Sequence, residues 1–394
     1  MLIDKYKKYK NKLVTIIRAA EKNYYTKKLV EVKDNMAKTW CILNKMTGRG
    51  QTHKTIKQIE INGEIIENPS TIADKFNDYF ANVGLELANK IAPSNRNALE
   101  FLKGDYRQSI FLEPTTEQEI VDIISNLKNT NSAGHDGLPI KLLKFCNAEL
   151  SPILAYINNE SLQNGIFPEF LKIARITPIY KAGDKKHVNN YRPVSILTSM
   201  SKIMEKVMYT RLINYLNKHS ILHQNQYGFR QNCSTNLALM KLVDDLTKAI
   251  DDKQLTVGIF VDLAKAFDTV DHQILLNKLE FYGIRGIAHN WFSSYLRNRK
   301  QYVSINKTMS NQVMVKCGVP QGSILGPILF LLYVNDLNYA SGKLRNIMFA
   351  DDTNLFMAGK SALLLEKAIN EELEIIASRF QANLLSLNIK KHLI

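Results

Sequence analysis

Apolar residues recur at helical spacing along most of the chain. In the N-terminal part, the pattern predicts helices over residues 1–47 and after Pro69, with a short hairpin around Asn62-Gly63 between them. A capping box at Thr116 opens the next helical segment. Helical patterns then cover residues 138–146, 151–164, 198–217, 235–252, 271–282, 286–297, 324–337 and 363–387.

Short β-branched runs between these helices predict strands. Pro178 indicates that one of them lies at a sheet edge, because proline cannot donate a ladder hydrogen bond. Another, Leu255 to Val261, is apolar enough for a buried strand. The runs cover residues 173–180, 255–261, 302–305 and 313–315. We therefore expect an α+β protein with a basic helical region at 1–110 and a mixed region at 111–394.

Two adjacent carboxylates, Asp351 and Asp352, stand between two short apolar runs, which predicts a β-hairpin with the acids at its turn. On this stretch alone, a solvated turn is the favoured interpretation. Asp262 ends the strand predicted at 255–261, 89 residues before Asp351. If these strands are neighbours, three carboxylates converge at one sheet edge. Such a set suits two Mg²⁺ ions, which can support in-line phosphoryl transfer.

The net charge of the chain indicates the kind of partner that it binds. The chain has 394 residues and a formal net charge of +15, with a globular composition of 45% hydrophobic and 23% charged residues. Residues 1–57 hold 15 Lys or Arg and 4 Asp or Glu, so most of the excess lies there. A nucleic acid is the first candidate partner, and an ordinary solvated Lys-rich helix is the alternative.

The cysteine spacing and the hydropathy of the chain indicate its cellular compartment. Cys41, Cys146, Cys233 and Cys317 have no metal-ligand spacing, which favours reduced thiols in an intracellular protein. The N-terminus lacks the apolar core of a signal peptide, and the longest apolar run is far too short to span a bilayer. We expect a soluble protein of the nucleus or cytoplasm with no membrane partner; its oligomeric state is not predicted.

Several segments together resemble a known family. Residues 260–268, 319–327 and 349–352 resemble polymerase motifs A, B and C of reverse transcriptases, most closely those of Jockey-like non-LTR retrotransposons. Further matches occur in the same order and spacing at 131–143, 191–193 and 227–230. Each motif alone is weak, but the ordered set, which spans at least residues 111–391, is highly specific.

The resemblance implies a right-hand polymerase with fingers and an antiparallel palm sheet, preceded by the helical N-terminal region. Its expected activity is RNA-directed DNA polymerisation, with an RNA template, a DNA primer and dNTPs as partners. The expected cofactor is a pair of Mg²⁺ ions, or Mn²⁺ in their place. Asp262 and Asp351 match the two main metal ligands, and Asp352 matches the second acid of motif C, with a supporting role.

The resemblance also implies a dNTP site. Phe267 matches the aromatic residue beneath the incoming sugar, where a bulky ring excludes a 2′-hydroxyl. Lys181 and Arg192 match cations that hold the triphosphate. Gln321 and Gly322 match the motif B loop, where glycine permits close backbone approach. The alternatives are a core Phe at 267 and ordinary surface charge at 181 and 192.

Other positions carry weaker implications. Arg230 resembles a template-side contact, and Lys391 matches a proposed proton donor to pyrophosphate. Asp268 is expected to be structural. The chain stops within motif D, so we expect a truncated copy of a longer protein, without thumb or upstream endonuclease. Two alternatives are a nucleic-acid-binding remnant without turnover and an RNA-dependent RNA polymerase; the aromatic ring of Phe267 counts against the latter.

Overall fold

The computed structural model describes residues 2–33, 35–47 and 56–388. The chain divides into two compact units, Met1–Ile56 and Lys57–Ile394. The first unit contains α1 (Leu2–Glu31) and α2 (Met36–Met46), so the helical pattern at its start is confirmed, with a break between two helices. The functional division between residues 110 and 111 stays a prediction.

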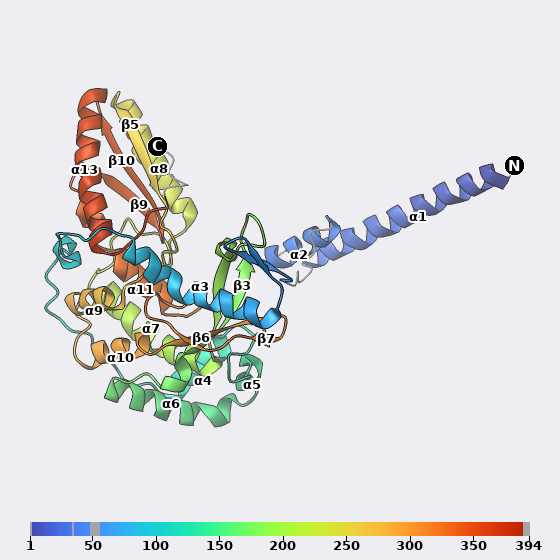
Figure 1. Cartoon of the computed structure of the whole chain (residues 1–394), viewed down its shortest axis with the longest axis horizontal. Coiled ribbons are helices and arrows are strands. Elements are labelled where there is room, and N and C mark those ends of the chain that lie inside the picture. Colours follow the sequence, from blue (N-terminus) through green and yellow to red (C-terminus); the bar gives the residue numbers. More distant parts are fainter. Residues whose placement is uncertain (1, 34, 48–55, 389–394) are drawn as a thin grey trace. The chain divides into compact units, whose positions relative to one another are not determined.

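The second unit is a mixed helix and sheet structure, as expected (Figure 1). It begins with the predicted hairpin of β1 (Ile59–Ile61) and β2 (Glu64–Ile66), in which Asn62 and Gly63 take positive φ values of 54° and 83°. Its helices are α3 (Pro69–Asn89), α4 (Glu117–Asn126), α5 (Ile140–Phe145), α6 (Asn147–Asn164), α7 (Ser199–Lys218), α8 (Thr235–Asp251), α9 (His272–Phe281), α10 (Ile287–Leu296), α11 (Gly326–Val334), α12 (Leu337–Ala340) and α13 (Ala362–Ala382).

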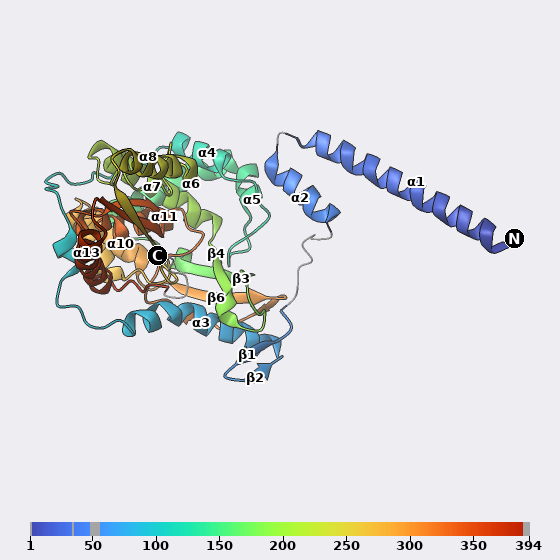
Figure 2. The same cartoon turned by 90° about the horizontal axis from the view of Figure 1, so that it is seen from above.

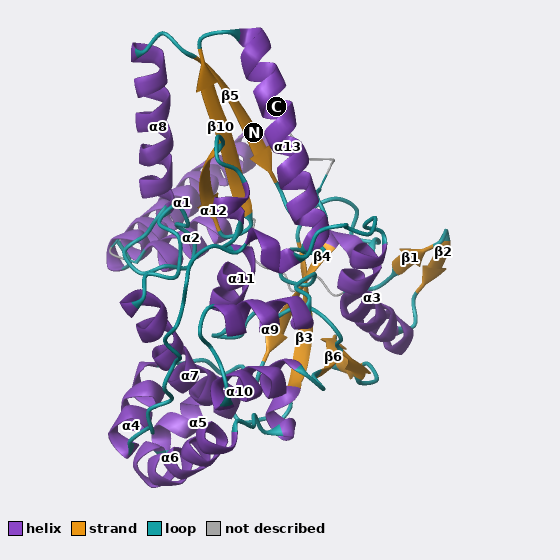
Figure 3. Cartoon of the chain, turned by 90° about the vertical axis from the view of Figure 1, so that its left-hand side faces the viewer, coloured by secondary structure: helices purple, strands orange, loops and turns teal. Residues whose placement is uncertain are grey.

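One sheet brings the carboxylate-bearing strands together. It has the order β5 (Leu255–Val261), β10 (Asp352–Gly359), β9 (Arg345–Phe349), with both pairings antiparallel. The sheet lies between α8 and α13 (Figure 3). The expectation that β5 is buried is wrong for most of the strand. β5 is an edge strand, and its Leu255 and Phe260 are exposed.

The second sheet has the order β4 (Tyr191–Ile196), β3 (Ile173–Tyr180), β6 (Lys300–Ile305), β7 (Thr308–Met309), and β8 (Val313–Met314) also pairs with β6. Because β3 has neighbours on both sides, the edge position inferred from Pro178 is wrong. The proline is tolerated because the parallel pairing with β6 ends at Ile176. Helix α3 packs along β6, β7 and β8 (Figure 2).

Helix α13 ends at Ala382, several residues earlier than the apolar pattern predicts. Leu384 takes a positive φ of 52°, which turns the chain back toward the end of β5. There Leu387 forms an isolated bridge with Leu263, and the Ser386 carbonyl accepts a 2.8 Å hydrogen bond from the N–H of Ala264. The segment after α13 therefore extends the three-stranded sheet instead of the helix.

The hydrophobic core runs from α6 and α10 through α11 to the three-stranded sheet, with Trp291, Phe330 and Leu355 almost fully buried along it. None of the described helices is long and apolar enough to cross a membrane. Cys146, Cys233 and Cys317 are free thiols, whereas the side chain of Cys41 lies outside the description.

A buried charge cluster joins α9, α12 and α13 beneath this core. Lys278, Asp336 and Arg379 are all fully buried. The Asp336 carboxylate accepts hydrogen bonds from Lys278 Nζ at 2.8 Å and from Arg379 Nη2 at 2.5 Å. Lys278 Nζ also donates to the Tyr333 carbonyl at 2.5 Å. The cluster therefore contains two cations and one anion.

Candidate functional site

The turn between β9 and β10 presents the predicted acid pair. Asp352 pairs with Phe349, which leaves Ala350 and Asp351 as the turn residues. Thr353 pairs with Val261, so Asp262, the next residue after β5, lies beside this turn. The fold thus brings the backbone positions of Asp262, Asp351 and Asp352 to the same end of the sheet, and their role as a metal site stays a prediction.

The three carboxylates influence one another electrostatically. Asp351 is half-buried, and burial raises its pKa; the charges of Asp352 and Asp262 raise it further. The charge of Arg192 opposes them and lowers the pKa of the same carboxyl. The edge therefore carries excess negative charge, with a cation from the other sheet close enough to act on it.

Asp262 is fixed by the segment that follows α13. Its Oδ2 atom accepts a 2.7 Å hydrogen bond from Asn388 Nδ2, and its carbonyl accepts a 2.9 Å bond from the Asn388 N–H. This pairing leaves the other carboxylate oxygen, Oδ1, outside the Asn388 contact.

Gln226 supports the turn that carries Asp351 through hydrogen bonds to the backbone. No sequence pattern indicated this role. Gln226 is 2% exposed, and its Oε1 atom accepts from the N–H groups of Ala350 at 2.9 Å and Gly228 at 2.8 Å. Ala350 has a positive φ of 57°, which is unusual for a residue with a Cβ. A Cβ on Gly228 would stand 2.3 Å from the Ala350 nitrogen, so the close approach requires glycine there.

Phe267 lies in a small aromatic group beside the acids. Its ring stacks on Phe330 of α11 with centroids 4.7 Å apart and planes 24° apart. Phe229 approaches it edge-on at 6.1 Å. Because rings on two sides hold it, Phe267 presents a fixed apolar surface.

The loop at residues 319–325 docks on the second sheet. The Ser195 N–H of β4 donates a 2.8 Å hydrogen bond to the Gln321 carbonyl. Gly322 has φ +131°, and a Cβ there would stand 2.4 Å from the Ser195 carbonyl oxygen. Gln321 Nε2 donates to both carboxylate oxygens of Asp268 at 2.9 Å. Both loop residues singled out from the sequence thus have defined positions, with the Gln321 amide bonded to Asp268.

Glu205 of α7 holds the other end of this loop. Its role was not predicted from the sequence. It is fully buried and accepts from the N–H groups of Ile324 at 2.7 Å and Leu325 at 3.2 Å, just before α11. Burial raises the pKa of its carboxyl, against the nearby charge of Arg299 and these hydrogen bonds. A buried carboxylate at a helix N-terminus is stabilised by the backbone N–H groups there, which have no acceptor within the helix.

Lys181 and Arg192 lie on the β3–β4 hairpin. Arg192 pairs with Ile179, so Lys181, two residues beyond Ile179, falls on the same face as Arg192. Both side chains are exposed. Burial lowers the pKa of Lys265, a residue just after β5 that the sequence reasoning did not select, and the charges of Lys181 and Arg192 lower it further.

Arg230 and Lys391 are the two other residues predicted for the site. Arg230 Nη1 donates to the carbonyls of His223 at 2.8 Å and Gln226 at 3.1 Å, so this nitrogen braces the segment that supports the acid turn. Its template role stays a prediction. Lys391 lies outside the described residues.

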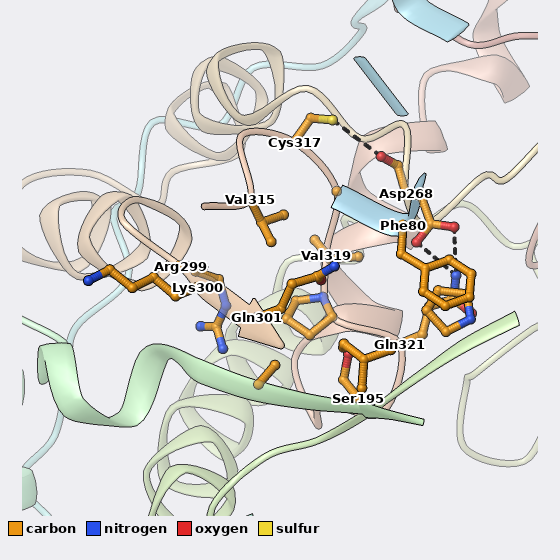
Figure 4. A pocket seen from close by; sticks show the side chains of 15 residues that line it. Phe80, Ser195, Asp268, Arg299, Lys300, Gln301, Val315, Cys317, Val319 and Gln321 are labelled. Atoms are coloured by element: carbon orange, nitrogen blue, oxygen red, sulfur yellow. Dashed lines mark hydrogen bonds between the residues drawn. The ribbon is translucent and has the colours of Figure 1, made fainter. Parts of the chain in front are cut away.

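A small cavity lies between the second sheet and the 319–325 loop. Figure 4 shows Phe80, Arg299 and Gln321 around it, with the bonds from Gln321 and Cys317 to Asp268. Its volume is about 40 Å³, room for a few water molecules at most. Arg299 Nη2 has no hydrogen-bond partner among the described residues. The cavity is too small for a nucleotide.

Divalent ions fit the donor chemistry of the acid edge. Within residues 2–33, 35–47 and 56–388, no three His, Cys, Asp or Glu side chains converge on one metal position. Mg²⁺, however, is commonly held by one or two carboxylates with substrate phosphates and water completing its shell. Burial raises the pKa of Asp351, and the charges of Asp352 and Asp262 raise it further; a divalent cation would relieve the repulsion among these carboxylates.

Comparison with known proteins gives consistent similarities. A family model described as "Reverse transcriptase (RNA-dependent DNA polymerase)" matches residues 181–394. The chain is 28% identical over 396 residues to a Drosophila melanogaster protein named "Probable RNA-directed DNA polymerase from transposon BS", covering 96% of this chain and 43% of that protein. It is 30% identical over 329 residues to the Drosophila melanogaster "RNA-directed DNA polymerase from mobile element jockey", covering 78% and 35%. The chain thus spans less than half the length of these relatives.

Proposed function

Because the chain belongs to the reverse transcriptase family, we propose that it is an RNA-directed DNA polymerase of a non-LTR retrotransposon. It would extend the 3′-hydroxyl of a DNA primer with dNTPs on an RNA template. The observation that carries this proposal is the meeting of Asp262 and Asp351 with the charge of Arg192 from the neighbouring sheet.

We assign the three-stranded sheet to a palm and the β3–β4 hairpin to fingers. Asp262 and Asp351 would hold two Mg²⁺ ions, or Mn²⁺, with Asp352 in a supporting role. When bound, such ions stabilise charge on the attacking and leaving oxygens of phosphoryl transfer. Asn388 orients Asp262, and Gln226 holds the turn that carries Asp351.

The remaining residues would bind the nucleotide. Lys181 and Arg192 are exposed on one face of the hairpin, where cationic donors can hold a triphosphate. Phe267 would lie beneath the sugar, and its packing against Phe330 and Phe229 would keep the ring from yielding to a 2′-hydroxyl. Gln321 and Gly322 would shape the surface against the base, and Arg230 would contact the template.

Primer extension tests the reaction. On poly(rA)/oligo(dT) with dTTP and Mg²⁺, the wild-type protein should incorporate dTMP, whereas Asp262→Asn and Asp351→Asn should reduce incorporation by a hundredfold or more. Asp244→Asn is the matched control, because this exposed acid of α8 lies outside the site. EDTA should also stop incorporation. Equal incorporation by wild type and both acid variants would refute the assignment.

Sugar selection tests the role of Phe267 and separates this function from RNA polymerisation. The wild-type protein should prefer dTTP to UTP, and Phe267→Ala should narrow that preference by admitting the 2′-hydroxyl. A preference for UTP that survives Phe267→Ala would favour an RNA-dependent RNA polymerase.

A second candidate is RNA binding without turnover, favoured by the first unit. On α1, Tyr6, Tyr9 and Tyr24 are exposed among lysines, an arrangement that can stack bases and neutralise phosphates. This candidate predicts salt-dependent RNA binding with no incorporation at any enzyme concentration. Detectable incorporation that depends on Asp351 would exclude it.

A further inference from the structure

Lys265 occupies the turn after β5, three residues beyond Asp262, and has a positive φ of 52°. Its side chain leaves the three-stranded sheet and reaches the second one. Nζ donates a 3.3 Å hydrogen bond to the Tyr191 carbonyl, the group whose peptide bond continues into Arg192. The lysine is half-buried. It therefore joins the strand that bears Asp262 to the strand that bears Arg192.

Helix α3 completes this connection. The ammonium group of Lys265 lies over the Tyr79 ring, 5.5 Å from its centroid. The Tyr191 ring packs edge-on against Phe76 at 5.0 Å. A Cβ on Gly84 would stand only 1.9 Å from the Asp268 carbonyl oxygen, so α3 touches the backbone just after Lys265. One helix thus contacts both ends of the Lys265–Tyr191 bond.

Charged groups act on the Lys265 ammonium, which forms the hydrogen bond to the Tyr191 carbonyl. Lys181 and Arg192 repel the ammonium of Lys265, whereas Asp268 attracts it. Gln321 in turn holds Asp268. The Tyr79 ring and the charge of Asp268 favour the ammonium at a position where two other cations act on it.

We propose that Lys265 is a positioning residue for nucleotide binding: by holding the Tyr191 carbonyl against α3, it fixes the backbone that presents Arg192 to the triphosphate. The inference rests on the proposed polymerase function. The proposal gives α3 a part in the site. This helix precedes residues 181–394, the segment that the family model matches.

Steady-state kinetics with dTTP tests this role. Lys265→Met should raise KM for dTTP about tenfold with a smaller change in kcat, because the Tyr191 carbonyl loses its charged donor and Arg192 is held less firmly. Lys265→Arg should recover most of the loss. Lys206→Met is the matched control, because Lys206 of α7 lies over Tyr209 at 4.8 Å in the same kind of ring contact. An unchanged KM in Lys265→Met would overturn the proposal.

A double-mutant cycle separates positioning from direct phosphate binding. If Lys265 acts through Arg192, then Lys265→Met combined with Arg192→Ala should have the KM of Arg192→Ala alone, within about twofold. Multiplication of the two single effects would show that Lys265 binds the triphosphate itself and would overturn the proposal.

Amide hydrogen exchange tests the anchor without any turnover. Lys265→Met should speed exchange in residues 181–192, and Lys265→Arg and Lys206→Met should not. Faster exchange with normal KM would place the bond outside nucleotide binding and refute the inference. If the wild-type protein incorporates no nucleotide, the polymerase function fails, and the exchange comparison still decides whether Lys265 anchors the hairpin.

Discussion

Removing the Asp336 carboxylate should destabilise the second unit far more than removing the Lys278 ammonium. Asp336 is the single anion between two cations, and all three side chains are fully buried. Asp336→Asn would leave Lys278 and Arg379 facing each other without a counter-charge, at a cost of about 3–5 kcal/mol. Lys278→Met would leave a balanced Asp336–Arg379 pair beside an apolar chain of similar length.

The pKa of Lys278 gives the size of the second effect. Burial lowers it from 10.5 to about 8, helped by the charge of Arg379 and opposed by that of Asp336. Keeping the ammonium protonated in the folded protein therefore costs roughly 3 kcal/mol. The pKa of about 8 already includes the attraction of Asp336, so Lys278→Met removes a net cost, and we expect no loss of stability at pH 7.

The sign of the pH dependence follows. Between about pH 8 and 10.5 the unfolded chain keeps the Lys278 proton and the folded chain releases it, so stability rises with pH in this window. Below pH 8 both states are protonated, and the penalty is constant. Relative to Lys278→Met, the wild-type protein should therefore gain roughly 2 kcal/mol between pH 7 and pH 9.5.

Urea unfolding followed by fluorescence of the buried Trp291 measures these differences. Wild type, Lys278→Met and Asp336→Asn are compared at pH 7 and pH 9.5. The reasoning is refuted if Lys278→Met costs as much as Asp336→Asn at pH 7. It also fails if the difference between wild type and Lys278→Met is the same at both pH values.

Three further substitutions test the loops around the carboxylates. Gly322→Ala should remove most dNTP incorporation, because its Cβ would clash with the Ser195 carbonyl oxygen 2.4 Å away; wild-type rates would show that the loop is free to move. Gln226→Leu should lower incorporation and should lower the free energy of unfolding by about 1–3 kcal/mol, because the buried Ala350 N–H loses its acceptor; an unchanged free energy of unfolding would contradict this. Glu205→Gln should lose less stability than Glu205→Leu, since the amide oxygen still accepts a backbone N–H; equal losses would argue against the capping role.

The sequence predicted the parts of the site that depend on local pattern. The acid turn and the strand ending at Asp262 have strong signals, because apolar runs flank short polar turns. Their juxtaposition was conditional on strand order, which sequence alone does not determine. The register of β10 with both β5 and β9 establishes this order.

The supporting residues could not be predicted, for a physical reason. Gln226, Glu205 and Lys265 each form a hydrogen bond to a backbone group more than 70 residues away. Such bonds leave no periodicity, since only one side chain takes part and its partner is a generic carbonyl or N–H. The end of α13 was overestimated for a similar reason, because an apolar pattern continues through Leu387 while distant pairing with Leu263 decides its conformation.

The pairing of β5 with β10 also sets the order of events when the chain is made. About 90 residues separate Val261 from its partner Thr353. At roughly 5–20 residues per second, β10 leaves the ribosome on the order of 5–20 s after β5. During that interval β5 has neither neighbour nor cover from α13, and its apolar residues are open to other nascent chains. A chaperone that binds extended apolar segments would therefore find a target in β5, the strand just before Asp262.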